Sequence, residues 1–130
     1  MSQAEPDAPP APDRPRVWKT PPNVALCAET DIAEPGARSF VLQIGEAFFH
    51  GFVVRKDGQV AGYVDRCPHA GYPLAVELDR YLTPDGGLIM CSWHGAVFEP
   101  LSGLCTGGPC AGGRLTPWPV QATGGIIRTA

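Results

Sequence analysis

Short runs of apolar and β-branched residues alternate with turn-forming residues along most of the chain. The clearest pattern is AFFHGFVVRK (47–56) followed by QVAGYVD (59–65), two β-rich runs joined by Asp57-Gly58. Asp-Gly between two such runs is a strong local signal for a tight hairpin. We therefore predict two antiparallel strands over residues 47–65.

Shorter runs of the same kind predict the other strands. They are VALCAETDI (24–32), SFVLQIG (39–45), GLIMC (87–91), GAVFEP (95–100), RLTPWPVQA (114–122) and GIIRTA (125–130). Turns are expected at EPGA (34–37), PLSG (100–103) and Thr123-Gly124-Gly125. Only PLAVELDRYL (73–82) could form a short helix, which Pro84 would end. The pattern predicts a small antiparallel all-β domain of about eight strands, without internal repeats.

The first 22 residues differ in character from the rest. They hold seven prolines and almost no apolar periodicity. Proline removes backbone donors and fixes φ, so residues 1–22 are expected to form a disordered tail, with one domain over 23–130. The whole chain has 16 glycines and 15 prolines, which favours short strands and tight turns over long helices.

Charge and length exclude several classes of function. The chain has 130 residues and a formal net charge of −3, so it lacks the basic excess that nucleic-acid binding needs. It contains no apolar run of the roughly 20 residues that would span a bilayer, and no export signal is recognised. We therefore expect a cytoplasmic protein. Because thiols stay reduced there, its five cysteines suggest metal or redox chemistry before disulfides.

Two Cys–His pairs carry the strongest chemical signal. Cys67 and His69 lie in CPH, and Cys91 and His94 lie in CSWH, each just after a predicted strand. Two thiolates and two imidazoles suit a tetrahedral zinc ion or a 2Fe–2S cluster of the Rieske kind.

Spacing favours the cluster over zinc. In a mononuclear zinc site all four ligands converge on one atom, and paired ligands usually have two to four residues between them. Only Pro68 separates Cys67 from His69. A binuclear cluster accepts this spacing, because each loop can give its Cys to one iron and its His to the other. Gly71 and Gly95 follow the pairs and would let the backbone approach the sulfides.

These residues resemble a known family. CPHAGYPL, CSWHGAVFEPLSG and GGPCAGG are similar to the two cluster loops and the proline-containing third loop of Rieske-type ferredoxins. The resemblance covers about 23–130. It implies an antiparallel β-sandwich with a small cluster-binding subdomain (loops about 66–113), in which Pro109 covers the cluster. It also implies that Cys67 and Cys91 bind one iron, and His69 and His94 the other.

The spacer between the pairs departs from the family. Residues 70–90 are longer than is usual there, and the excess is expected in DRYLTPDG (79–86), as a surface excursion that leaves the cluster untouched. It could alter what docks nearby.

The resemblance also bears on the redox potential. An oxidised cluster with two thiolates and two neutral histidines is itself neutral, so it is easier to reduce than a four-thiolate cluster. Rieske potentials span about −150 to +300 mV. High-potential respiratory members have a Ser and a Tyr that donate to sulfur where this chain has Ala96 and Phe98. Their cluster-loop disulfide is also missing, since Tyr72 and Trp93 replace its cysteines. We predict a potential near the low end of the range.

The remaining cysteines have alternative roles. Cys105 and Cys110, beside the third loop, are interpreted as two small buried thiols, with a disulfide across a tight loop as the alternative. A role for them as cluster ligands is disfavoured because four ligands are already found. Cys27 is expected in the core.

His50 and the three tryptophans also need an interpretation. His50 lies in a strand pattern and is expected to be a surface or satisfied strand residue. Trp93 lies between two candidate ligands, where it would pack beneath the loop or form an apolar rim for a partner. Trp18 and Trp118 are interpreted as packing or tail-anchoring residues.

The resemblance implies a one-electron carrier between redox proteins. It would take an electron from a reductase and pass it to a terminal acceptor, such as a Rieske oxygenase, with His69 and His94 as the exit. An oxygenase site needs two further histidines and a carboxylate, and only His50 is left, so we expect no catalytic site. The alternatives are a small Rieske subunit of a nitrite-reductase-like enzyme and a structural zinc protein. The sequence does not name the donor, the acceptor, the pathway or the oligomeric state.

Overall fold

The computed structural model describes residues 16–66, 80–91, 95–108 and 113–130. Within these ranges ten strands form three antiparallel sheets, and the helical structure is a single 3₁₀ turn, η1 (Glu29–Asp31). The strands are β1 (Ala25–Ala28), β2 (Gly36–Ile44), β3 (Ala47–Lys56), β4 (Gln59–Val64), β5 (Ile89–Met90), β6 (Val97–Phe98), β7 (Cys105–Gly107), β8 (Pro117–Trp118), β9 (Val120–Thr123) and β10 (Ile126–Thr129).

The predicted hairpin is confirmed as β3 and β4. These strands pair antiparallel from Lys56 opposite Gln59 to Gly51 opposite Val64. Asp57 and Gly58 both have positive φ, 54° and 74°, as a two-residue turn that follows the twist of the strands requires. Together with β2 and β8 they form the central sheet, in the order β2-β3-β4-β8.

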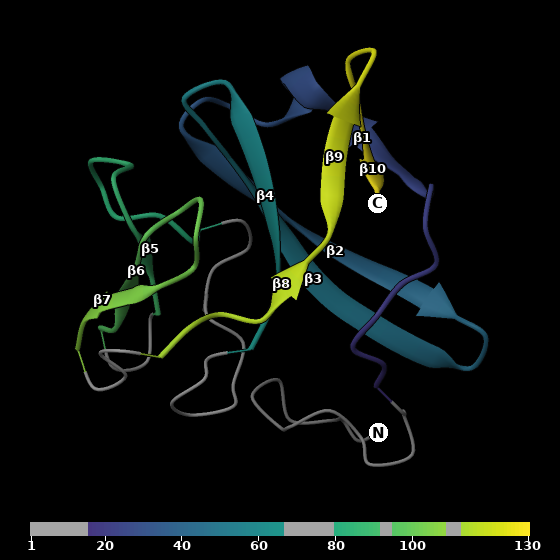
Figure 1. The fold of residues 1–130 in the computed structure, drawn as a ribbon, viewed down its shortest axis with the longest axis horizontal. Coiled ribbons are helices and arrows are strands. Elements are labelled where there is room, and N and C mark those ends of the chain that lie inside the picture. Colours follow the sequence, from purple (N-terminus) through teal and green to yellow (C-terminus); the bar gives the residue numbers. More distant parts are fainter. Residues whose placement is uncertain (1–15, 67–79, 92–94, 109–112) are drawn as a thin grey trace, which may run out of the picture.

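The other two sheets lie on either side of the central one. In Figure 1, β5, β6 and β7 lie on the left of β4, whereas β1, β9 and β10 lie on its right. Their orders are β5-β6-β7 and β1-β10-β9. The all-β sandwich with a small subdomain, expected from the resemblance, is confirmed.

Two apolar cores fill the space on the two faces of the central sheet. The Trp118 core consists of Ile32, Phe49, Val53, Val64, Trp118 and Ile127. The Tyr81 core consists of Phe52, Val54, Tyr63, Tyr81, Ile89, Cys91, Ala96, Phe98, Cys105 and Leu115. Since side chains alternate along a strand, β3 contributes to both. Burial of both faces explains why β3 reads as a nearly continuous apolar run.

One predicted strand divides into two. The run RLTPWPVQA forms β8 and β9, which belong to different sheets, because β8 pairs with β4 and β9 pairs with β10. Pro119 stands between them and has no N–H to donate. The chain therefore leaves one sheet and joins the next at this residue.

Contacts with the domain begin before the expected boundary at residue 23. The N–H of Val17 donates to the carbonyl of Phe48 at 3.0 Å, and the Trp118 indole Nε1 donates to Thr20 Oγ1 at 2.9 Å. The Thr129 hydroxyl donates to the carbonyl of Pro21 at 2.7 Å. Residues 16–22 thus lie against the sheets, and Trp118 anchors them, as one of its two predicted roles implied.

Two further segments differ from expectation. The described end of PLAVELDRYL is extended, since Leu82 forms a β-bridge with Ile89; residues 73–79 lie outside the described ranges. Strand β7 was not predicted, because three residues are too few to show an alternating pattern. No helix among the described residues has the length and apolar character needed to cross a bilayer.

Candidate metal centre

The described part of the chain contains one of the four candidate ligands, Cys91. Cys67, His69 and His94 lie outside it. Cys91 directly follows β5 and is fully buried, with 0% of its surface exposed. It therefore stands at the end of a strand, as predicted from the sequence.

The backbone around Cys91 folds back on itself. The Cys91 N–H donates to the carbonyl of Ala96 at 2.8 Å, and the Gly95 N–H donates to the carbonyl of Cys91 at 3.0 Å. Gly95 has a φ of +72°, which glycine adopts far more readily than other residues. Its conformation thus supplies a reason for glycine here in addition to the close approach expected from the sequence.

The start of the third loop lies against this turn. A Cβ added to Gly108 would lie 2.7 Å from the Cα of Ala96, and one added to Gly107 would lie 3.2 Å from a Val97 methyl. At Gly108 only a residue without a Cβ lets the two backbones come this close, because the added atom would meet the Ala96 backbone. The second and third loops therefore meet at Ala96, as a site shared between them requires.

The residues that lead into CPH leave the central sheet at β4. The Asp65 N–H donates to the carbonyl of His50 at 3.0 Å, which continues the β3–β4 pairing by one residue. The exposed Arg66 places its guanidinium carbon 5.2 Å from the centre of the Trp18 ring, and Arg16 lies 5.1 Å from the same ring. A positive charge thus precedes Cys67 in the chain.

Ala96 and Phe98 are both fully buried in the Tyr81 core, together with Cys91. Neither side chain can donate a hydrogen bond. These two side chains therefore contribute only apolar atoms to the core that holds Cys91. The low potential inferred from them stays a prediction.

The other side chains considered in the sequence have structural surroundings. Cys105 is buried, and its thiol donates to the carbonyl of Gly107 at 3.2 Å; Cys110 lies outside the described residues. Cys27 is partly buried against the Trp118 core, and burial raises the pKa of its thiol. His50 is half-buried in β3, where burial and then the charge of Arg16 lower its pKa, while Asp65 opposes them. These positions suit structural roles.

Sequence reasoning overlooked two residues beside the site, Asp65 and Tyr81. The Tyr81 hydroxyl donates to Asp65 Oδ2 at 2.7 Å, and the Tyr81 side chain is buried. The two residues lie 16 positions apart, Asp65 at the end of a predicted strand and Tyr81 in the segment for which a helix was considered, so no local pattern connects them.

The donor set and its surroundings fit an iron–sulfur cluster. Within the described ranges no group of three or more His, Cys, Asp or Glu side chains gathers, because three of the four candidates lie outside those ranges. What the structure does show is a buried cysteine at a strand end, with the Gly95 turn bonded to it and Gly108 packed against Ala96 of that turn. Thiolate ligands and a shielding apolar shell are what a 2Fe–2S cluster requires.

Comparison with known families decides the question. The family model of the Rieske [2Fe-2S] domain matches residues 23–121. The chain belongs to this family. Its cofactor is a 2Fe–2S cluster, and its role is electron transfer. No curated protein matches the chain.

Solved structures share the fold. One match is a chain of the "complex of reduced oxygenase and oxidized ferredoxin in carbazole 1,9a-dioxygenase", with 26% identity and a TM-score of 0.65, covering 82% of this chain and 100% of that chain. Another complex of oxygenase and ferredoxin of the same dioxygenase gives 21% identity and a TM-score of 0.66, covering 81% of this chain and 27% of that chain. The terminal oxygenase of carbazole 1,9a-dioxygenase from Novosphingobium sp. KA1 gives 22% identity and a TM-score of 0.64, covering 82% of this chain and 29% of that chain. The last two show the fold alone.

Proposed function

We propose that the protein is a Rieske-type ferredoxin, a one-electron carrier that passes electrons from a reductase to a terminal oxygenase or a similar acceptor. The family supplies the cofactor, and the bound cluster supplies the one-electron chemistry. The chain's own residues would hold the cluster, exclude water from one side of it and let the electron pass to the partner protein.

One observation carries the carrier role. The chain covers, with 82% of its residues, 100% of a chain from a ferredoxin–oxygenase complex, whereas with 81% of its residues it covers only 27% of a longer chain from the same system. A match of this kind supports a Rieske module that works as a separate carrier. The acceptor class comes from the same comparison.

We further propose that Cys67 and Cys91 bind one iron and that His69 and His94 bind the other. The support is the pattern of the two motifs and the buried position of Cys91 beside Ala96. In such an arrangement the two histidines form the expected exit for the electron.

The carrier role can be tested on the isolated chain. We expect it to purify as a coloured protein with two irons per chain. The dithionite-reduced form should give a Rieske EPR spectrum and reduce cytochrome c by one electron per chain. Obligate co-purification with a large subunit would favour the reductase-subunit alternative, and a colourless protein with one zinc would exclude the cluster.

Two buried cysteines of the same core give a matched test of the ligands. Cys91→Ser should abolish the EPR signal and most of the bound iron, because serine lacks the thiolate that holds the metal. Cys105→Ser should retain both, since the Cys105 thiol already donates to Gly107. Loss of the cluster from both variants would show that the core, and not a ligand, had been disturbed.

A further inference from the structure

The long spacer between the two ligand pairs is more than the surface excursion expected from the sequence. Tyr81, in its second half, is 3% exposed and belongs to the Tyr81 core. Its ring stacks on Phe52 of β3, with ring centres 4.1 Å apart and planes 7° from parallel. The expectation was wrong for this residue, because the apolar face of β3 is available to cover it.

Tyr81 contacts the chain just before each ligand loop. Its hydroxyl donates to Asp65 Oδ2 at 2.7 Å, and Asp65 is two residues before Cys67. Its carbonyl accepts the N–H of Met90 at 2.8 Å, and Met90 immediately precedes Cys91. One residue therefore bonds to both loop ends while its ring is fixed on the central sheet.

We propose that Tyr81 is a positioning residue that sets the distance and orientation between the two ligand loops. The cluster needs ligands from both loops, so a change in their separation strains every metal bond. A hydrogen bond to a carboxylate is stronger than one between neutral groups and is suited to hold such a separation. The inference rests on the family's cofactor and not on the carrier role proposed above.

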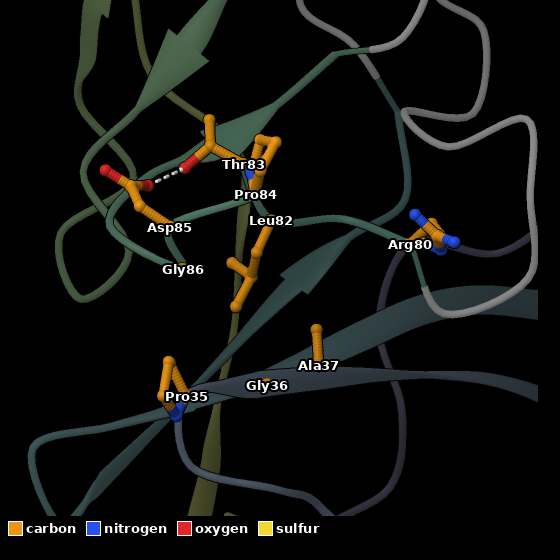
Figure 2. Close-up of a pocket in the computed structure, with 9 residues that line it drawn as sticks. All are labelled: Pro35, Gly36, Ala37, Arg80, Leu82, Thr83, Pro84, Asp85 and Gly86. Atoms are coloured by element: carbon orange, nitrogen blue, oxygen red, sulfur yellow. Dashed lines mark hydrogen bonds between the residues drawn. The ribbon is translucent and has the colours of Figure 1, made fainter.

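Neighbouring residues hold the spacer in place around Tyr81. Figure 2 shows Leu82 pointing toward Ala37 of β2, and Pro35 facing the turn at Gly86. That turn packs closely, because a Cβ on Gly86 would lie 2.5 Å from Pro35 Cγ. The Lys56 ammonium donates to the carbonyl of Gly87 at 3.1 Å. The segment that follows Tyr81 is therefore held against β2 and β3, while the Tyr81 ring itself is fixed on Phe52.

The test removes one hydroxyl and keeps the ring. Tyr81→Phe in the full-length holoprotein should release iron to excess EDTA about tenfold faster than the unmodified protein, the effect of losing one charged hydrogen bond. The g values of its reduced cluster should also shift, because the ligand geometry relaxes.

Tyr63→Phe is the matched control. Tyr63 also lies against Phe52, with ring centres 5.6 Å apart, and its hydroxyl also donates at 2.7 Å, but to the carbonyl of Pro100 and in a fully buried position, whereas the Tyr81 bond is partly buried. Burial, reinforced by Glu99 and opposed by Arg114, raises its pKa to about 12, so it remains a neutral donor. This variant should unfold at a lower temperature, yet keep wild-type g values and release iron within about twofold of the wild-type rate.

Variants of Asp65 complete the experiment. Asp65→Asn keeps an oxygen that accepts from Tyr81 and should hold iron better than Asp65→Ala, which removes the acceptor. Unchanged iron release and g values in Tyr81→Phe would overturn the proposal, as would equal effects in Tyr63→Phe. A different result would contradict the carrier role: a protein with a normal cluster that passes no electron to an acceptor.

Discussion

The two faces of the central sheet are covered in different ways. Four of the six residues of the Trp118 core lie on strands of four residues or more, and its largest side chain packs against Phe49, with ring centres 4.7 Å apart. The Tyr81 core is built mainly from two- and three-residue strands and the segments between them, and it contains two tyrosine hydroxyls and two thiols. The Trp118 core has one polar group, the Trp118 indole N–H, which donates to Thr20, whereas the Tyr81 core holds several polar groups.

This difference suggests that the two cores have different roles, one in stability and one in ordering the metal centre. Apolar packing between long strands contributes free energy without fixing any reactive group. Buried polar groups add little net stability, but each must find its partner, so they fix the positions of nearby segments. We infer that the Trp118 core mainly stabilises the domain, while the Tyr81 core orders the metal centre.

The largest expected effect is on the Trp118 core. Trp118→Ala should lower the free energy of unfolding by about 3–5 kcal/mol, because it leaves a large cavity between two sheets. It also removes the bond that holds Thr20. Urea denaturation measures the change.

Trp18→Ala is the control for that variant, since Trp18 is 44% exposed and should cost less than about 1 kcal/mol. The molecules of Trp118→Ala that remain folded should keep a normal EPR spectrum. An altered spectrum at full occupancy would show that the two cores are coupled more closely than we propose.

The next effect concerns the potential and distinguishes the two cores directly. Phe98→Tyr introduces a hydroxyl beside Cys91 in the Tyr81 core. A donor to sulfur that stabilises the reduced cluster by about 1 kcal/mol raises the potential by about 40 mV. Protein-film voltammetry measures the shift.

Phe49→Tyr places the same hydroxyl in the Trp118 core and should leave the potential unchanged. A wild-type potential above about +100 mV would contradict the low-potential assignment that underlies this pair of variants. Equal shifts in both variants would contradict the separation of roles.

The smallest effect is electrostatic. Arg66→Gln removes a positive charge next to Cys67 in the chain and should lower the potential by no more than about 20 mV, because even at about 8 Å a unit charge in water contributes only about 0.5 kcal/mol. The shift should diminish at high salt, since Arg66 is exposed.

Arg38→Gln is the comparable change on the other side of the molecule. Arg38 also lies over a ring, 5.5 Å from the centre of Phe40, but it contacts Asp31 beside β1. The redox potential of the Arg38→Gln variant should stay at the wild-type value. A larger shift in Arg38→Gln than in Arg66→Gln would refute the assignment of the cluster to the Tyr81 side.

Local patterns were enough to predict much of this protein. The β3–β4 hairpin follows from Asp57-Gly58 and its flanking strands, because a turn and its neighbours interact over a few residues. The family follows from the Cys–His motifs and glycines, because ligand spacing is a property of the chain itself. The outer strands were located for the same reason, with ends shifted by a few residues.

Tertiary structure alone decided which segments meet. Nothing local indicates that β8 and β9 join different sheets, that residues 16–22 lie against Trp118, or that Tyr81 reaches Asp65. Each of these depends on which apolar surface is left to cover once the central sheet has formed, and that surface is shared by residues distant in the chain. The sequence by itself therefore determined the hairpin, the all-β class and the family with its 2Fe–2S cofactor. The fold decided that Tyr81 of the spacer bonds both to Asp65 and to Met90.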